Sequence, residues 1–245
     1  MHQGFAAIRL TVLAAWLMAA ALAGPAVAGP FEDAGEAYKR GDYATAMRLM
    51  RPLADQGNAR AQHNLGFMYD KGEGVPQNHA EAVKWYRRAA DQGDPRSQFN
   101  LGGMYSNGQG VPQDHAEAVK WYRRAAEQGN AEAQFNLGAK YNDGQGVPQN
   151  HAEAVKWYRR AADQGDAWAQ LDLGFMYLNG LGVPQDYVQS HKWSNLAASR
   201  LPVSEKEVRD NAVKNRDLAA ARMTPAQIAE AQKLAREWRP KPETK

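Results

Sequence analysis

The sequence predicts an all-α fold, an α-solenoid of paired antiparallel helices with a helical cap at its C-terminal end. One observation is a twenty-residue segment, residues 74–93, that recurs unchanged at residues 146–165 and with two conservative changes at residues 110–129. The other is a row of tryptophans in which each lies 36 residues from the next: Trp85, Trp121, Trp157 and Trp193. A fixed period of this size is typical of supersecondary units stacked along one axis.

The composition excludes several classes of protein and site. The chain has 245 residues and a formal net charge of +3, with basic and acidic residues interleaved, so we expect no nucleic-acid partner. It has no cysteine, which excludes disulfides, thiolate metal sites, a cysteine nucleophile and an N-terminal lipid-modified cysteine. No catalytic triad, P-loop or other nucleotide motif stands out. We therefore expect no bound cofactor or metal and no catalytic residue.

Residues 1–28 differ from the rest and predict a cleaved secretory signal. An uncharged apolar run that begins at Leu10 is followed by a Gly-Pro helix breaker and by an Ala-Val-Ala motif ending at Ala28. Cleavage near Ala28 would leave a periplasmic or secreted protein with no membrane span, which we expect to be a monomer. The alternative is an uncleaved N-terminal membrane anchor, since residues 10–28 are about long enough to cross a bilayer.

Residues 29–57 predict a degenerate helical hairpin. A short helix runs through Tyr38, a turn falls at Gly41-Asp42, and a second helix follows. Asp42 is the expected N-cap of that second helix because its carboxylate can accept hydrogen bonds from free amides of the first turn. Pro52 lies inside the same helix and is expected to bend it or to end its hydrogen-bond ladder early.

Four units of one plan follow, at residues 58–93, 94–129, 130–165 and 166–201. In the first of them Asn58 is the expected N-cap of one helix. After a loop, Asn78 opens a second helix with Glu81 three residues further on, as in a capping box. Gly66 lies inside the first helix at a cost in stability, so we expect close approach of the partner helix there. The pattern decays after Trp193, where stacking is expected to change.

Residues 202–239 predict a pair of capping helices. A capping box at Ser204 opens one helix, which is expected to run to about Met223, and Thr224 opens the other. One face of the last helix carries Ile228, Ala231, Leu234, Ala235 and Trp238. We expect the pair to cover the apolar face of the last unit. Residues 240–245 are expected to form a disordered polar tail.

These units resemble a known repeat family. The pattern A-x-A-Q-x-N-L-G-x-M-Y, then G-x-G-V-P-Q, then A-x-x-W-Y-x-x-A-A-x-Q-G, recurs from about Asn58 to Ser199. It resembles the Sel1-like repeat, which is related to the tetratricopeptide repeat but has a longer loop between its two helices. The resemblance implies antiparallel helix pairs stacked into a right-handed superhelix, and protein–protein interaction rather than catalysis as the usual role.

The repeated histidines and tryptophans could be sites or part of the frame. The histidines His79, His115 and His151 share one slot, and equivalent slots lie about 10 Å apart between packed helices. One metal ion needs all its ligands within about 2 Å. We therefore interpret these histidines as solvated surface residues. We interpret the tryptophan row as core rather than as a ligand site.

The repeated arginine pairs also have two interpretations. They begin at Arg87, Arg123 and Arg159. One interpretation is a basic stripe for an acidic partner. We favour a solvated outer face balanced by residues such as Glu81 and Asp91, because the near-neutral net charge argues against strong anion capture.

The residues that vary while the frame stays constant form the candidate site. By analogy with tetratricopeptide arrays, the first helix of each unit lines the concave surface. The candidate partner-binding residues are Arg60, His63, Asn64, Phe67, Arg96, Phe99, Asn100, Glu132, Phe135, Asn136, Trp168, Asp172 and Phe175. Carboxamides can hydrogen-bond an extended peptide, and aromatic residues anchor interfaces. The alternative, strongest for Phe99 and Phe135, is packing between neighbouring first helices.

The sequence thus predicts a non-enzymatic bacterial scaffold that binds a protein or peptide in its concave face in the cell envelope. It would act as an adaptor, or as a regulator that sequesters the outer part of a membrane sensor. The alternative is a cell-wall ligand binder or hydrolase, because some cysteine-rich relatives of the repeat are associated with peptidoglycan or β-lactam binding. This chain lacks those cysteines.

Overall fold

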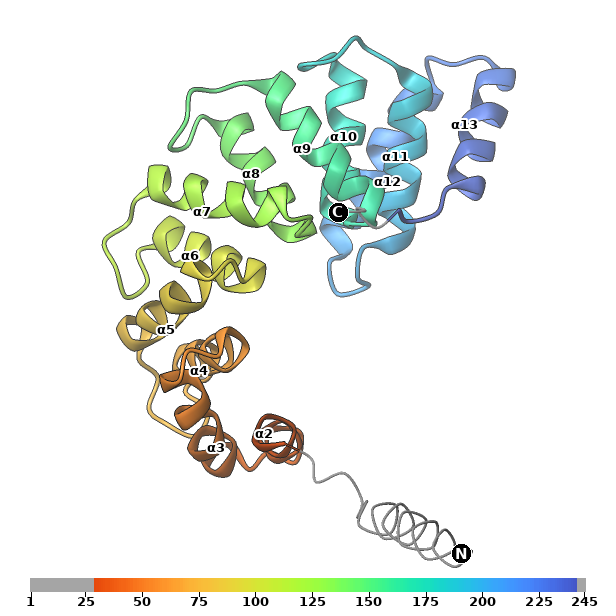
Figure 1. Ribbon diagram of the computed structural model, residues 1–245. Helices are drawn as coiled ribbons and strands as arrows, with labels where there is room; N and C mark the ends of the chain where they lie inside the picture. Colours follow the sequence, from red (N-terminus) through yellow and green to blue (C-terminus); the bar gives the residue numbers. More distant parts are fainter. Residues whose placement is uncertain (1–28, 242–245) are drawn as a thin grey trace, which may run out of the picture.

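The computed structural model describes residues 29–241, which form a curved stack of helices (Figure 1). This part of the chain holds twelve helices and no strand. The helices are α2 (Pro30–Lys39), α3 (Tyr43–Asp55), α4 (Ala59–Lys71), α5 (His79–Asp91), α6 (Pro95–Asn107), α7 (His115–Glu127), α8 (Ala131–Asp143), α9 (His151–Gln164), α10 (Ala167–Asn179), α11 (Tyr187–Arg200), α12 (Lys206–Ala220) and α13 (Pro225–Glu237). None of them is long and apolar enough to span a bilayer. The predicted signal, residues 1–28, lies outside the described residues.

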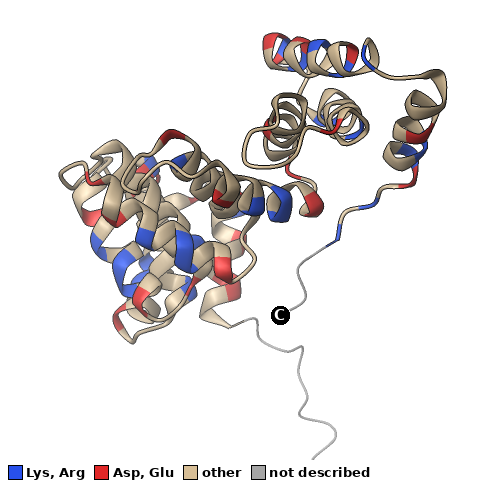
Figure 2. Ribbon diagram, turned by 90° about the horizontal axis from the view of Figure 1, so that it is seen from above, with Lys and Arg blue, Asp and Glu red and all other residues tan. Residues whose placement is uncertain are grey.

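Consecutive helices pack as pairs, and each pair packs on the next. The pairs are α2–α3, α4–α5, α6–α7, α8–α9 and α10–α11, and the stack curves from α2 to α11 (Figure 1). The all-α solenoid predicted from the repeat is confirmed. Basic and acidic residues both occur along the whole stack (Figure 2).

Local capping signals set the helix boundaries. Asn58 accepts the amide of Ala61 at 3.0 Å, and Asn78 accepts the amide of Glu81 at 3.0 Å. The predicted N-caps are therefore confirmed, but the reciprocal half of the capping box at Glu81 is absent. The Glu81 carboxylate pairs with Lys84 one turn further on instead. The Asn78 amide, which would complete the box, donates to the Tyr69 carbonyl at 2.8 Å.

Pro52 does not end its helix. The α3 helix continues through Pro52 to Asp55, and Asp42 accepts the amide of Thr45 as the predicted N-cap. The amide of Gln56 donates to the Pro52 carbonyl at 3.1 Å, so the hydrogen-bond ladder resumes after the proline.

The glycine inside α4, α6 and α8 makes room for an aromatic ring, whereas Gly174 in α10 faces Ser194. A Cβ atom on Gly66 would lie 2.6 Å from the Tyr86 ring, and one on Gly102 would lie 2.7 Å from the Tyr122 ring. The predicted close approach of the partner helix is confirmed, and its cause is a tyrosine ring packed flat against the glycine. The tyrosines Tyr86 and Tyr122 are themselves buried.

Buried glutamines join one unit to the next. The side-chain amide of Gln134 donates to the carbonyl of Ala126 at 3.0 Å, and its oxygen accepts from Gln164 at 2.8 Å. Gln62, Gln98 and Gln170 donate to the equivalent carbonyls at the ends of the preceding helices. Each glutamine adds a second donor to a carbonyl at a helix end that already accepts a backbone amide, as Ala126 does from Gly129 at 3.1 Å.

The cap begins later than predicted. Helix α12 starts at Lys206 after Glu205, which makes no side-chain capping bond, and it ends at Ala220 rather than at Met223. The capping box expected at Ser204 was therefore wrong. A turn in which the amide of Glu205 donates to the carbonyl of Pro202 keeps Ser204 in the loop. The reciprocal capping box appears in α13, between Thr224 and Gln227.

The two last helices pack over the end of the stack. Helix α12 packs on α10 and α11, and α13 packs on α11. The Trp238 ring lies 6.4 Å from that of Trp193, and the Arg200 guanidinium lies 4.3 Å above it. The amide of Lys241 then donates to the carbonyl of Asp163 at 2.8 Å, so residues 240–241 lie against α9, where we expected a disordered tail.

Candidate functional site on the concave face

The variable slots lie on α4, α6, α8 and α10, the helices expected to line the concave surface, and differ in exposure. The exposed candidates are Arg60, Arg96, Glu132, Trp168 and Phe175. The half-buried ones are Asn64, Phe67, Phe99, Asn100, Phe135, Asn136 and Asp172. Only His63 is buried. The exposed residues that change between units, from arginine to glutamate to tryptophan, are the ones free to contact a partner.

A hollow of about 430 Å³ opens between α2 and α4 at the N-terminal end. Met50 from α3 forms its floor, with Asn64 and Phe67 on α4 and Tyr38 on α2 around it. The Asn64 amide lies 3.9 Å from the sulfur of Met50, and the Tyr38 hydroxyl donates to Glu73 at 2.6 Å. The hollow is apolar with polar groups at its edge, a common composition for a binding pocket.

His63 is part of the packing between α4 and α6. Its Nδ1 lies 3.0 Å from the Ser97 hydroxyl and 3.5 Å from the Asp94 carboxylate. Burial and the nearby Arg96 lower its pKa to about 4, although Asp94 acts in the opposite direction. A neutral, enclosed ring has little surface left for a ligand. The alternative interpretation, packing between first helices, fits this residue.

Phe99 and Phe135 occupy the same slot in the next two units. Their rings lie 6.0 Å from Tyr122 and 5.8 Å from Tyr158, respectively. Both remain partly exposed, so they pack within the frame and also offer an edge to the concave face. A smaller hollow of about 150 Å³ lies between the first and second units. Its lining includes Tyr86, Phe99 and Asn100.

A second large hollow lies at the C-terminal end, between α10 and α12, and we call it the α10–α12 groove. Its volume is about 420 Å³. It is lined by Leu171, Asp172, Phe175, Leu178 and Asn179 from α10 and by Asn211, Lys214, Asn215 and Leu218 from α12. The residues of α12 were not predicted as site residues. Their spacing of three and four places them on one helix face, which is the signal that could have found them.

Asp172 is the titratable group inside this groove. Burial raises its pKa to about 6, and the neighbouring carboxylates Asp143 and Asp166 act in the same direction. A hydrogen bond with Tyr158 partly offsets this effect. The equivalent residues of the other three units are Asn64, Asn100 and Asn136.

Sequence comparison assigns the repeat. The Sel1 repeat model matches residues 32–58, 59–94, 95–130, 131–166 and 169–200. The chain belongs to the Sel1 repeat family. Such proteins are generally non-catalytic scaffolds for protein–protein interaction. A search of curated proteins found no match.

Two solved structures are similar to this Sel1 repeat chain. A Sel1 repeat protein from Oxalobacter formigenes is 32% identical with a TM-score of 0.67, over 85% of this chain and 96% of that one. A protective antigen of uropathogenic Escherichia coli is 37% identical with a TM-score of 0.69 and covers 79% of this chain. This chain spans only 40% of that antigen's length.

The repeated histidines of the Sel1 units are partly exposed, where full solvation was expected. Each is half-buried at the start of a second helix. The Nδ1 atom of His79 lies 3.0 Å from the carboxylate of Asp70, and that of His151 lies 3.0 Å from the amide oxygen of Asn142, so both link the two helices of their own unit. The Nδ1 atom of His115 instead lies 3.2 Å from Nζ of Lys140 in the next unit. Within residues 29–241, no group of three or more His, Cys, Asp or Glu side chains is placed to hold a metal ion.

The arginine pairs of the Sel1 units contact aromatic rings. Arg123 donates to the Tyr141 hydroxyl of the next unit at 2.6 Å. The Arg124 guanidinium lies 4.5 Å from the Trp121 ring, since flat guanidinium groups stack on aromatic faces. Arg87, Arg88 and Arg124 are exposed, which agrees with the favoured interpretation of a solvated face.

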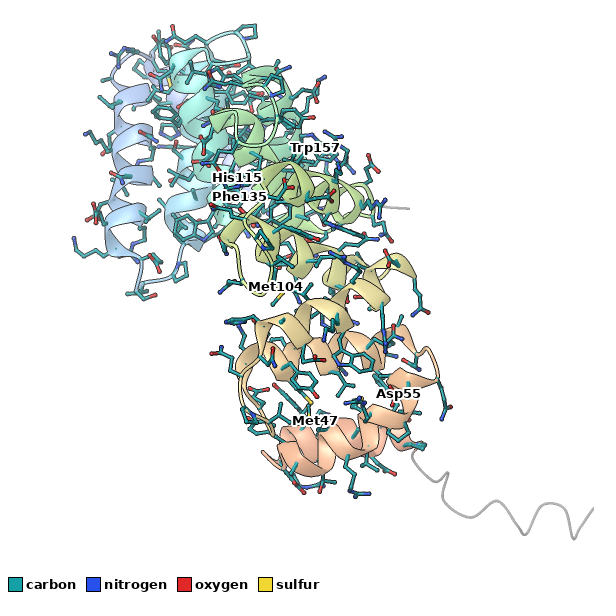
Figure 3. All side chains as sticks on the ribbon, turned by 90° about the vertical axis from the view of Figure 1, so that its left-hand side faces the viewer. Met47, Asp55, Met104, His115, Phe135 and Trp157 are labelled. Atoms are coloured by element: carbon teal, nitrogen blue, oxygen red, sulfur yellow. The ribbon has the colours of Figure 1, made fainter. Side chains whose placement is uncertain are left out.

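The tryptophan row belongs to the Sel1 frame. Trp85, Trp121 and Trp193 are buried, which agrees with their interpretation as core. Trp157 is half-buried and packs against the cluster formed by α7 and α8 (Figure 3).

Proposed function

We propose that this Sel1 repeat protein is a non-enzymatic scaffold of the bacterial cell envelope that holds a protein or peptide partner in its concave face. The observation that carries the proposal is that constant and variable residues occupy different positions within the repeat. Residues that pack or cap recur in every unit, whereas one exposed slot changes from Arg60 and Arg96 to Glu132 and Trp168. A surface that varies on a constant frame is suited to recognition rather than to stability.

The envelope location rests on residues 1–28, whose apolar run and Ala-Val-Ala motif are typical of an export signal. Intact mass spectrometry of the protein recovered from a periplasmic fraction tests it. We expect a mature chain that begins at Gly29. Recovery of the whole chain from the cytoplasm would contradict an envelope role.

Site-specific photocrosslinking in the producing cell tests the concave face. A photoreactive residue replaces Arg96 or Glu132 on the concave face, and Lys84 or Lys120 on exposed positions of α5 and α7 as matched controls. We expect one discrete crosslinked protein from the first pair and none from the second. Equal crosslinking from both pairs would refute the concave-face assignment.

A combined substitution tests the same surface without a photoreactive group. Arg96, Asn100 and Asn136 are changed together to alanine. We expect the crosslink from Glu132 to disappear while the circular dichroism spectrum and melting temperature of the protein stay close to wild type. A crosslink of undiminished yield would show that these side chains do not hold the partner.

A further inference from the structure

The α10–α12 groove differs from the rest of the concave face because its apolar walls are open to solvent. Phe175 is 46% exposed and Leu218, on the facing wall, is 39% exposed. Trp168 is 39% exposed. It lies about one turn before Leu171 and two turns before Phe175 on α10. Large apolar side chains exposed together are a common mark of an interaction site.

The groove exists because α12 is not another first helix of the repeat. In the earlier units, His63, Phe99 and Phe135 each pack toward the next first helix: His63 contacts Ser97 of α6, and the two phenylalanines pack on clusters that include residues of α8 and α10, respectively. In the last unit Leu171 occupies that slot, and it packs with Val208 against the cluster of Leu201 and Ala212. The shorter side chain and the displaced helix leave the adjacent volume of about 420 Å³ unfilled.

Asp172 lines this groove and has other acids near it. The carboxylates Asp143 and Asp166 act on Asp172, and Glu132 acts on Asp166. The groups that shift the pKa of Asp172 include no lysine or arginine. Lys214 lines the opposite wall but is not among the charges that act on Asp172.

Asp172 stands where the other units have asparagine, and the frame does not require a charge there. A carboxylate that burial disfavours lowers the stability of the fold, whereas the neutral Asn100 in the same slot does not. Residues that lower the stability of the fold and that packing does not require are characteristic of functional sites.

We propose that the α10–α12 groove anchors the partner by binding a peptide segment in which a lysine or arginine lies beside a large apolar residue. The cation would meet the Asp172 carboxylate, and the apolar side chain would lie between Phe175 and Leu218. The amides of Asn179, Asn211 and Asn215 line the same groove and can bond the peptide backbone. This inference rests on the proposed scaffold function and names the chemistry of the partner.

Binding of three labelled peptides of equal length to the full chain tests the proposal by fluorescence anisotropy. One alternates leucine and lysine, one alternates leucine and glutamate, and one alternates serine and lysine. At about 0.15 M salt, where long-range attraction is screened, we expect the leucine–lysine peptide to bind at least about tenfold more tightly than the others. Equal binding of the leucine–glutamate peptide would overturn the charge preference.

Two substitutions locate the site, and each installs a residue that another unit holds in the same slot. Asp172→Asn should weaken the leucine–lysine peptide about tenfold, and Phe175→Ala should weaken it by a similar factor. The matched control is Val203→Ala, an apolar side chain that is 77% exposed and does not line the groove, which should leave binding unchanged. No effect of Asp172→Asn, or equal effects of Phe175→Ala and Val203→Ala, would overturn the proposal.

The pH dependence of binding is a second readout. We expect wild-type binding to weaken as the pH falls through about 6, where Asp172 is protonated, and the Asp172→Asn variant to show no such step. The groups facing Asp172 are Tyr158, Asp143 and Asp166, with Lys214 on the opposite wall. A step that persists in the variant would assign the effect to another group and overturn the role of Asp172.

Two outcomes separate this inference from the scaffold function. If crosslinks form at Arg96 and Glu132 but the groove variants bind all peptides like wild type, the scaffold stands and the groove proposal fails. If peptide binding depends on Asp172 but no crosslink forms in the cell, the scaffold function fails. Self-association that Phe175→Ala abolishes would make the groove an interface between copies and overturn the peptide proposal.

Discussion

Single residues decide how closely the two helices of a unit approach. A Cβ atom on Gly138 would lie 2.7 Å from the Tyr158 ring. We expect Gly138→Ala to lower the free energy of unfolding by about 1–3 kcal/mol through overpacking, although alanine favours the helix by about 1 kcal/mol. Urea denaturation followed by circular dichroism measures the change.

The matched control is Gly35→Ala in α2, where an added Cβ would meet no atom within 4 Å. There only the helix preference acts, so we expect a gain of up to about 1 kcal/mol. A loss at Gly35 as large as that at Gly138 would show that steric contact with the tyrosine is not the cause.

His63 is expected to reduce stability in acid. Its folded pKa of about 4 lies below the ordinary value of 6.5, so the unfolded chain binds more protons between these values. The ionisation of His63 therefore leaves the free energy of unfolding unchanged above pH 6.5 and lowers it as the pH falls from 6.5 toward 4. His63→Phe, which installs the residue found at Phe99 and Phe135, should therefore reduce the loss.

Urea denaturation at two pH values tests this. Between about pH 7 and about pH 4.5 we expect wild type to lose about 2 kcal/mol more than His63→Phe. Asp172, whose pKa is raised to about 6, also titrates in this range, but it is present in both proteins. If the free energies of unfolding of the two proteins changed equally with pH, His63 would be excluded as the source of the acid-induced loss.

The helices themselves could be predicted because their signals are local. Asn58 and Asn78 precede the amides they cap by three residues, and both caps were recognised from the sequence. At Ser204 the same local reasoning was wrong, because the turn that ends at Glu205 delays the helix. Local patterns therefore place most boundaries, and competing turns displace a few.

Contacts between elements could not be predicted in the same way. Gln134 was visible as part of the repeated pattern, yet its partners Ala126 and Gln164 lie on other helices. The α10–α12 groove depends on how Phe175 and Leu218 are placed across a change in packing. A one-dimensional pattern identifies repeated residues but does not report which atoms a fold brings together.

Gln134→Leu tests the link between elements. It removes one donor to the Ala126 carbonyl, which still accepts from the Gly129 amide at 3.1 Å, and it removes the acceptor for the Gln164 amide. We expect a loss of about 1–2 kcal/mol in the free energy of unfolding. The control is Gln77→Leu, whose amide donates to the Asp70 carbonyl from an exposed position. Water can replace that bond, so a comparable loss in the control would contradict the explanation.

The whole molecule behaves as a sum of units and of the interfaces between them. Deletion of residues 94–129 joins α5 to α8 with the repeat in register, because neighbouring units present similar faces. We expect a folded protein with unchanged helicity per residue, measured by circular dichroism, and a lower melting temperature. The Arg96 position would be lost with the unit, and the α10–α12 groove would remain.

Deletion of residues 166–201 is the contrasting case. This unit supplies α10 and α11, on which α12 and α13 pack. We expect the last two helices to lose their order and the helicity per residue to fall. If the two deletions lowered helicity equally, the units would not be interchangeable modules.

Because the C-terminal segment packs back against α9, the two ends of the stack differ in their resistance to force. A solenoid frays from its ends, but here Trp238 packs on Trp193 of α11 while Lys241 bonds to Asp163 of α9. The C-terminal segment thus holds to two units at once, whereas the N-terminal pair α2–α3 packs on the single unit α4–α5. Under tension applied to both termini, the stack should unravel from α2 and release the N-terminal hollow first.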